Sequence, residues 1–458
     1  MSTLDKATRI QLFQFNSPAM RAFHLTWMAF FLCFFAWFAI APLMTVVREE
    51  LQLSKDQIGW CMIGSVAVTV LARLIMGWAC DRYGPRLAYT WLLMLSSLPL
   101  IGISFAHDFQ SFLFFRVLIG GIGASFVITQ FHMSVMFAPN CVGTANATTA
   151  GWGNLGGGVT QMVMPLVFTF FIAVMGLSSS ASWRVAMSLT GVLCFIAGLV
   201  YLRFTQDTPA GNYAELRAAG KMPPPKATQG SFWEACCNHR VWALAALYAA
   251  CFGVELTLNN VAVLYLVDSF AALKSLEPAE AMKMAGLIAG VCGSMNLFAR
   301  ALGGFMADRW GKRWGLAGRV KLLFLLVFVE GLVLMLFAQS STLWGAVPAL
   351  LALTLLIAMA CGATFAVVPF ISSRGLGAVS GIVGAGSNIG AVAAGFLFKL
   401  EGLDWSTALF LLGAMVTCFS FLCFAVNFSP AAELAARRSI EAASGHAAHP
   451  PELASAAS

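Results

Sequence analysis

The chain has 458 residues, of which 59% are hydrophobic and only 10% are charged, and its mean hydropathy is +0.81. Charged residues make up about a quarter of a soluble globular domain, so the composition excludes that class and predicts an integral membrane protein. The formal net charge of +7 implies no nucleic-acid partner, because basic loops beside an anionic membrane surface account for it.

Apolar stretches of about 20 residues, the length that a helix needs to cross a hydrocarbon core of roughly 30 Å, recur along the whole chain. They do not alternate between polar and apolar residues as the strands of a membrane β-barrel do. The sequence therefore predicts an all-α integral membrane protein with twelve transmembrane helices. The expected spans are 24–47, 58–80, 87–106, 112–137, 143–174, 183–203, 240–268, 285–308, 320–338, 343–370, 375–398 and 405–427.

A polar, proline-containing stretch at residues 204–239 interrupts this pattern for longer than any other loop. We therefore expect two six-helix bundles, residues 1–203 and 240–428, joined by a cytoplasmic linker. Residues 429–458 are expected to form a mostly disordered cytoplasmic tail, with a short helix around Ala431–Ile440. Lysine and arginine concentrate in the loops on one side, so we expect both termini in the cytoplasm. We expect the protein in the inner (plasma) membrane of the cell.

One pattern occurs twice, 227 residues apart, which is close to half of the chain. An arginine lies eight residues before the aspartate of a Gly-x-x-x-Asp-Arg element, first as Arg73, Gly77, Asp81 and Arg82 and again as Arg300, Gly304, Asp308 and Arg309. Eight residues of helix place each leading arginine about 12 Å deeper than its loop aspartate, near the middle of the membrane. A charge at that depth costs about 2.5–3.5 kcal/mol, so each arginine must face a cavity or a partner.

Structural ion pairs are one explanation for these arginines. The mid-span acids are Glu255 and Glu330, and we expect Glu330 to lie nearer a membrane interface. Even if Glu255 pairs with one arginine, one cation is left over. This surplus favours an anion site between the two halves.

The duplicated element resembles a known family. The segments Gly77–Arg86 and Gly304–Arg313 resemble the signature loops between helices 2 and 3 and helices 8 and 9 of the major facilitator superfamily, and Arg116 followed by Gly120 and Gly121 is similar to its fourth-helix motif. We expect the aspartates to cap neighbouring helix N-termini and the arginines to bridge to carboxylates or helix ends. These contacts would hold one conformation closed and break in the other, so the element would act as a gate. Membrane anchoring is the alternative for the arginines. The expected gate residues are Asp81, Arg82, Asp308 and Arg309.

Two glycine-rich segments, 150–161 and 381–391, occupy equivalent places in the two halves. They resemble the nitrate signatures of the nitrate/nitrite porter family, and the first is most similar to the branch shared by cyanobacterial and plant high-affinity carriers. Helix packing alone is the alternative explanation. We expect Asn154 and Asn388 to donate amide hydrogens to the substrate, while glycines let the helices approach and slide. These glycines are Gly151, Gly153, Gly156, Gly157, Gly158, Gly384, Gly386 and Gly390.

The resemblance implies nitrate transport, and the residue types fit a planar monovalent anion. The guanidinium groups of Arg73 and Arg300 can bind two oxygens each and shed water easily. Flat faces suit aromatic neighbours, for which Phe34, Phe35 and Tyr265 are the candidates. A buried carboxyl can titrate near neutral pH, which makes Glu255 the candidate proton-coupling residue.

The sequence thus predicts a secondary active transporter that takes up nitrate with protons. Nitrate/nitrite antiport is the first alternative, and an organic-anion or phosphate-ester facilitator is the second. A non-transporting nitrate sensor built on the same fold is a further alternative. An enzyme is the least expected class, because no Ser/His/Asp or metal-ligand set lies within the spans. Expected partners are nitrate, with nitrite as a second candidate, the proton and membrane lipid. The twelve cysteines lack metal-ligand spacing, so we expect a monomer without metal or cofactor.

Overall fold

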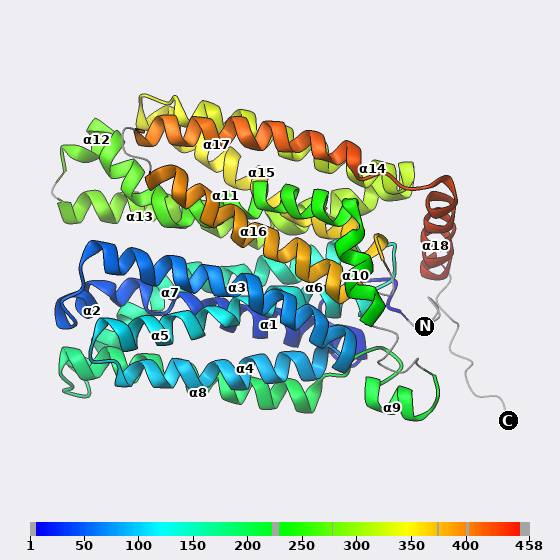
Figure 1. Cartoon of the computed structure of the whole chain (residues 1–458), viewed down its shortest axis with the longest axis horizontal. Coiled ribbons are helices and arrows are strands. Elements are labelled where there is room, and N and C mark those ends of the chain that lie inside the picture. The colour runs from blue at the N-terminus through cyan, green and yellow to red at the C-terminus, as the bar shows by residue number, and fades with distance from the viewer. Residues whose placement is uncertain (1–5, 222–228, 277, 373–374, 400–402, 449–458) are drawn as a thin grey trace.

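The computed structural model describes residues 6–221, 229–276, 278–372, 375–399 and 403–448. In these residues, long helices run side by side in two groups (Figure 1). The first group contains α1 (Pro18–Phe38), α2 (Met44–Glu50), α3 (Lys55–Tyr83), α4 (Pro85–Gly102), α5 (Phe109–Gly120), α6 (Ser125–Met136), α7 (Val142–Ala173) and α8 (Ser179–Phe204).

The second group is preceded by two short helices in the stretch that was expected to be a linker, α9 (Tyr213–Ala218) and α10 (Gln229–Cys237). It contains α11 (His239–Ser269), α12 (Ala271–Lys274), α13 (Pro278–Ser294), α14 (Ala299–Ala338), α15 (Leu343–Val367), α16 (Leu376–Lys399) and α17 (Trp405–Ser420). A last helix, α18 (Pro430–Ala448), follows.

The helices account for the twelve expected spans. Ten segments of the described chain are long and apolar enough to cross a membrane. One of them, Leu287–Ala338, has 52 residues and contains two expected spans, while α7, with 32 residues, is the expected fifth span. The fold is therefore that of twelve transmembrane helices in two six-helix bundles.

Local sequence signals set the helix boundaries. Ser17 caps α1 by accepting from the N–H of Met20, and Ser54 forms a capping box with Gln57 at the start of α3. Gly84, with φ of 93°, separates α3 from α4, since a residue with a side chain adopts that conformation only with strain. Gly315, with φ of 70° and ψ of −155°, breaks α14 in the same way, so its two parts form separate spans.

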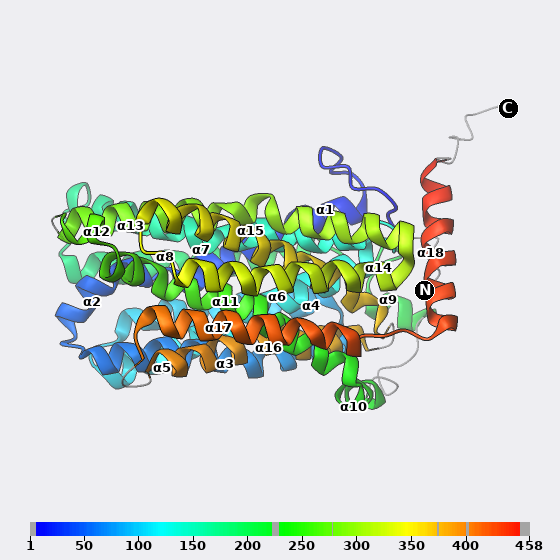
Figure 2. The same cartoon turned by 90° about the horizontal axis from the view of Figure 1, so that it is seen from above.

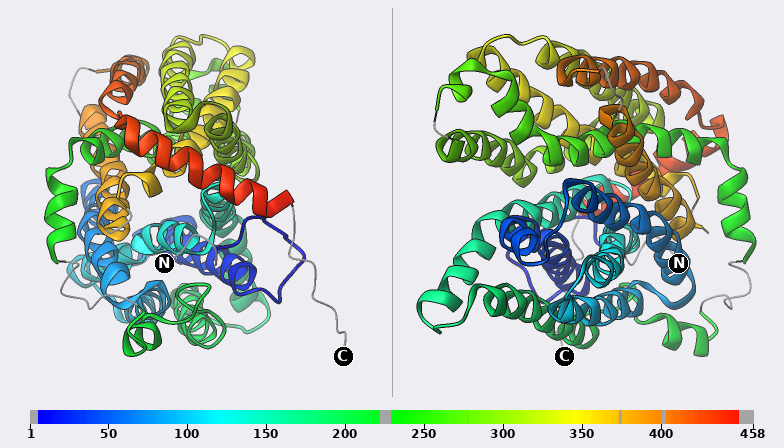
Figure 3. Two further views of the ribbon diagram at one scale, coloured as in Figure 1. Left: turned by 90° about the vertical axis from the view of Figure 1, so that its right-hand side faces the viewer. Right: turned by 60° about the vertical axis from the view of Figure 1, so that its left-hand side comes forward.

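The N-terminal segment and α18 lie at the same end of the bundle, here named the terminal end (Figures 1 and 2). Figure 3 shows α18 lying across this end. The tail therefore differs from the expected disorder in residues 430–448, whereas 449–458 lie outside the described residues. Alanine has the highest helix propensity, and Glu433 and Arg437 form an i,i+4 ion pair at 3.6 Å, which explains the helix.

The two groups touch most extensively through two matched helix pairs, α3 with α16 and α7 with α14, and α7 with α15 and α6 with α16 add further contacts. The glycines of the duplicated element make these contacts close. A Cβ on Gly77 would lie 2.3 Å from Gly377 O, and one on Gly304 would lie 2.4 Å from Gly143 O. Both contacts are backbone to backbone, so any side chain there would separate the two halves near the terminal end.

Candidate functional site

Two buried arginines from different halves meet at one aromatic ring. Arg73 of α3 and Arg300 of α14 are 0% and 1% exposed. The Cζ atom of Arg73 lies 5.8 Å from the ring centroid of Phe252 on α11, and that of Arg300 lies 5.0 Å from the same centroid. The structure thus brings together the two arginines that the sequence pattern singled out.

Arg73 has only neutral partners among the described residues. Its Nε donates to Gly123 O at 3.3 Å, and its Nη1 donates to Ser387 Oγ at 2.6 Å and to Gly384 O. The guanidinium also lies over the ring of Phe126, 5.4 Å from its centroid. Its Nη2 is buried without a protein partner, so Arg73 keeps its full charge and one free donor.

Arg300 is partly neutralised. Its Nη2 lies 2.7 Å from Glu255 Oε2, and Glu255 Oε1 accepts from Asn296 Nδ2 at 2.9 Å. With its amide oriented so that Oδ1 faces the guanidinium, Asn154 accepts from Nη1 and Nη2 at 3.1 and 2.9 Å. Asn154 therefore acts as an acceptor for Arg300 here, rather than as the donor that the sequence predicted. The Nε of Arg300 is buried without a partner.

An aromatic cluster that sequence reasoning missed surrounds the arginines. The rings of Phe126, Tyr248 and Phe252 stack in pairs, with centroids 5.4–5.9 Å apart and interplanar angles of 15–19°. Phe365 of α15 packs edge-on against Phe126 and Tyr248 at 4.8 and 5.0 Å. Helical spacing could have revealed part of this cluster, because Tyr248, Phe252 and Glu255 follow one another at one turn of α11.

The hydroxyl of Tyr248 adds a third free donor. It is buried without a hydrogen-bond partner and interacts electrostatically with both Arg73 and Arg300. A buried polar group without a partner costs about 1–3 kcal/mol. The free donors of Tyr248, Arg73 and Arg300 therefore favour a bound anion, and the surplus of one positive charge over Glu255 favours a monovalent one.

Three of the aromatic and amide candidates lie elsewhere. Phe34 packs against Phe30, at 4.6 Å between centroids, on the face of α1 toward α7. Tyr265 lies ten residues beyond Glu255 on α11, about 15 Å along the axis, and packs against Phe337 at 5.3 Å. Asn388 uses its Nδ2 to donate to Val66 O at 3.1 Å, and it is its neighbour Ser387 that contacts Arg73.

Phe35 is half-buried, and its backbone N would lie 2.9 Å from a Cβ added to Gly156. Phe35 therefore lies against the glycine-rich helix α7. The sequence had no means of choosing among the 38 phenylalanines, because apolar and aromatic residues fill every span.

Most of the glycines of the two segments pack helices within a half. A Cβ on Gly156 would lie 2.0 Å from Phe31 O of α1, and one on Gly386 would lie 2.3 Å from Ala245 O of α11. The glycines with such packing contacts inside a half are Gly153, Gly156, Gly157, Gly386 and Gly390, whereas Gly151 and Gly384 face the other half, near Arg300 and Arg73. Gly158 differs from the expectation, since an added Cβ would meet nothing within 4 Å.

The two motif aspartates bind the opposite half at the terminal end. Asp81 accepts from the N–H groups of Gly377 and Ala378 at 3.1 and 3.0 Å, in the first turn of α16. Asp308 accepts from those of Gly143 and Thr144 at 3.2 and 2.7 Å, in the first turn of α7. Each carboxylate thus lies at the positive end of a helix dipole across the interface between the halves.

The gate arginines are placed differently from the expectation. Arg82 is half-buried and lies over the rings of Trp78 and Tyr83, at 5.4 and 5.5 Å, while Arg309 is exposed. The cation that pairs with Asp308 is Arg319, which is fully buried, with Nη1 2.7 Å from Oδ1. Arg319 lies eleven residues after Asp308, beyond the break at Gly315, so only the folded turn brings the two together.

The turn between α3 and α4, which follows Asp81, is bound by Asp207 at the start of the linker. Asp207 accepts from the N–H groups of Arg86 and Tyr213 at 2.8 and 3.0 Å. Burial raises the pKa of the Asp207 carboxyl, and these two hydrogen bonds oppose that rise without cancelling it. The Arg86 side chain donates to Leu202 O, so the second arginine of the signature joins α4 to α8.

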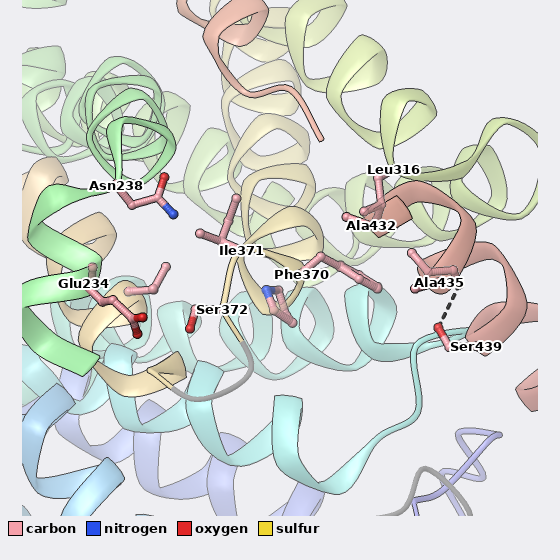
Figure 4. A pocket seen from close by; sticks show the side chains of 13 residues that line it. Glu234, Asn238, Leu316, Phe370, Ile371, Ser372, Ala432, Ala435 and Ser439 are labelled. Atoms are coloured by element: carbon pink, nitrogen blue, oxygen red, sulfur yellow. Dashed lines mark hydrogen bonds between the residues drawn. The ribbon is translucent and has the colours of Figure 1, made fainter. Parts of the chain in front are cut away.

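A large cavity of about 740 Å³ lies apart from the arginines, at the terminal end. Figure 4 shows its lining by α10, α14, α18 and the turn that follows α15. Its one charged lining residue is Glu234, which would repel an anion. The arginine cluster, and not this cavity, has the chemistry of an anion site.

Comparisons with known proteins agree with this geometry. Residues 26–374 match the Major Facilitator Superfamily. The "High affinity nitrate transporter 2.5" of Arabidopsis thaliana is 40% identical over 424 residues, which cover 92% of this chain and 82% of that protein. The "Nitrate/nitrite transporter NrtP" of Nostoc punctiforme is 28% identical, with 90% and 93% covered.

A solved structure of the proton:xylose symporter XylE superposes with a TM-score of 0.65 and 14% identity, covering 90% of this chain and 96% of that one. This likeness supports the fold. The fold, the duplicated element and the extent of the match to both named relatives lead to one conclusion. The chain belongs to the nitrate/nitrite porter family of the major facilitator superfamily, a family of transporters and not of enzymes.

Proposed function

We propose that this protein carries nitrate into the cell by proton symport, with alternating access of the two six-helix bundles. One observation carries the proposal: Arg73, Arg300 and Tyr248 direct free buried donors toward one aromatic cluster at the boundary between the halves. Nitrate is planar, monovalent and weakly hydrated, so guanidinium forks and flat rings suit it. The named relatives are nitrate transporters, which supports this choice of anion.

The conformation supports access from the side opposite the terminal end. Bonds between α3 and α16 extend from Asp81 to Val66. Bonds from α7 extend from Thr144, which meets Asp308 of α14, to Trp152, which donates to Leu297 O in the turn before α14. Asp81, Thr144 and Trp152 lie in the half of their helix that is next to the terminal end, and Val66 lies just past the middle of α3. Because both termini are expected in the cytoplasm, the closed terminal end is the cytoplasmic side of the inner membrane. The conformation is therefore outward-facing.

Asp81 and Asp308 are then the gates that hold the cytoplasmic side closed. Each must leave a helix N-terminus of the other half before the site can open inward. The loss of two dipole-stabilised contacts, each about 0.3–1 kcal/mol or up to ~2 kcal/mol when partly buried, is small enough for a bound substrate to offset. Arg319 pairs with Asp308 within the second half and donates to Pro139 O of the first half at 3.0 Å, so it adds a further contact that favours the closed state.

Coupling to protons is assigned to Glu255. An anion that binds Arg300 competes with Glu255 for the same guanidinium, and a carboxylate displaced from its partner in a low-dielectric site takes up a proton. Nitrate and proton would then move together. Nitrate and the proton can drive the conformational change only to the extent that they bind one conformation more tightly than the other, as alternating access requires.

Nitrate binding to the purified, detergent-solubilised protein tests the substrate assignment. Isothermal titration with nitrate, nitrite, phosphate and a small organic anion should show binding of the two planar monovalent anions and none of phosphate. A preference for phosphate or the organic anion would contradict the proposal. Nitrate/nitrite exchange is the second candidate, because the NrtP relative is named for both ions.

A further inference from the structure

A carboxyl that the proposed mechanism does not use lies in the core of the second half. Glu330 is 0% exposed, and both of its carboxyl oxygens are buried without a partner in the part of the chain that the structure describes. The sequence suggested an interface position, and the structure differs. Arg300 and Glu330 lie fifteen residues on either side of Gly315, so both are about 22 Å from the turn and at the same depth.

The groups around Glu330 supply no positive charge to bind it. Its ionisable neighbours are Cys361 on α15 and Glu255 on α11, with Cys251 of α11 beside Cys361. On the side of α17, the next residue Gly331 meets Thr417 and Gly413, which are neutral. On its own helix, Arg300 is already paired with Glu255 and Arg319 with Asp308, while Lys321 lies nine residues, or about 13 Å, along the axis.

An ionised carboxylate in such a place is strongly disfavoured, because even after relaxation the desolvation of a buried ion costs several kcal/mol. Glu330 is therefore neutral in this conformation and holds a proton. Before an anion binds and displaces Glu255, the central cluster then contains two positive charges, Arg73 and Arg300, and one negative charge, Glu255. Its net charge of +1 matches a monovalent anion, whereas ionisation of Glu330 would reduce that net charge to zero.

We propose that Glu330 is a second proton-binding group of the transport cycle, whose ionisation removes the net positive charge that holds the anion at Arg73 and Arg300. This inference rests on the proposed function of that anion site. Loss of the proton breaks the O–H bond of Glu330, leaves a carboxylate, and passes the proton to a water molecule, which becomes hydronium. By linkage, a bound proton tightens anion binding and a bound anion tightens proton binding to the same extent.

The test is the pH dependence of nitrate affinity in purified wild type and in Glu330→Gln. One linked proton weakens the affinity by up to about tenfold per pH unit above the titration point. Glutamine reproduces the neutral carboxyl, so the variant should bind nitrate as wild type does at acid pH. The nitrate affinity of the variant should depend less steeply on pH, by the contribution of one proton, and the variant should take up fewer protons per nitrate bound. Glu49→Gln, at an exposed position on α2, is the matched control and should keep the wild-type slope.

An unchanged slope in Glu330→Gln, with nitrate still bound, would overturn this inference and leave the proposed function intact. Absence of nitrate binding by wild type at every pH would instead refute the proposed function. If Glu330→Gln does not fold, Glu330→Asp decides. A shifted pH midpoint of nitrate affinity in the aspartate variant supports the assignment, and a wild-type midpoint overturns it.

Discussion

The guanidinium of Arg300 pairs with the carboxylate of Glu255 between α14 and α11, with Nη2 and Oε2 2.7 Å apart. Its counterpart in the other half, Arg73, binds two backbone carbonyls and a serine hydroxyl instead. The duplicated arginines are therefore chemically unequal. Arg73 supplies the permanent charge of the anion site, and Arg300 supplies a charge whose availability depends on Glu255.

Replacing either arginine by lysine should remove most transport although the charge is kept. A lysine ammonium cannot reach Gly123 O, Ser387 Oγ and an anion at once, as the fork of Arg73 can. Losing one charge-assisted contact costs about 1.5–3 kcal/mol, or ten- to over a hundredfold in nitrate affinity. Titration of Arg73→Lys and Arg300→Lys with nitrate measures this loss.

The control for these variants is Arg203→Lys, at an exposed position on α8, which should bind nitrate as wild type does. Wild-type affinity in Arg73→Lys or Arg300→Lys would remove that residue from the substrate site.

Tyr248→Phe should weaken nitrate binding, because it deletes a buried hydroxyl that has no protein partner. A hydrogen bond to a charged ligand contributes about 1.5–3 kcal/mol, so we expect at least a tenfold loss of affinity without a loss of thermal stability in the nitrate-free protein. Tyr265→Phe is the matched control, since that ring packs far from the arginines, and it should change neither quantity. Equal nitrate affinities in the two variants would show that Tyr248 has only a packing role.

Two glycines of α7 differ in their surroundings, because one packs against α1 and the other does not contact a neighbouring helix. A Cβ on Gly156 would lie 2.0 Å from Phe31 O, whereas one on Gly158 would meet nothing within 4 Å. Gly156→Ala should therefore destabilise the protein by about 1–3 kcal/mol and reduce transport, and Gly158→Ala should leave both unchanged. Thermal unfolding and uptake assays check this pair, and equal behaviour of the two variants would contradict the packing described for α7.

Glu255→Gln should uncouple transport from the proton. The amide mimics the protonated carboxyl, so Arg300 is free for the anion but no charge change links the site to pH. Proton-driven accumulation of nitrate should be lost, while nitrate counterflow in proteoliposomes persists. Accumulation that survives in this variant would exclude Glu255 from coupling and favour nitrate/nitrite exchange.

The duplicated pattern of the sequence predicted the most important features of the fold and the site. Twelve apolar spans, a break between the halves and the equal depths of Arg73 and Arg300 all follow from spacing, because helical rise converts residue counts into depth. The contact of Glu255 with Arg300 was foreseeable as well, since few acids lie within the spans.

Other parts of the site depend on helix rotation, which spacing along the chain does not determine. Phe252 and Tyr248 lie on the face of α11 toward the arginines, which the apolar pattern of that span does not indicate. Arg319 reaches Asp308 only because Gly315 reverses α14. Glu330 is buried because the second part of α14 packs between α15 and α17, an arrangement with no signal in the apolar pattern of that span.

The most direct test of the central claim is uptake of labelled nitrate into proteoliposomes that contain the wild-type protein, with and without an imposed inward proton gradient. We expect accumulation above the external concentration when the outside is acidic, and only equilibration when the gradient is absent or collapsed by a protonophore. Nitrate uptake that ignores the proton gradient but depends on nitrite inside the vesicles would contradict proton symport and establish exchange instead.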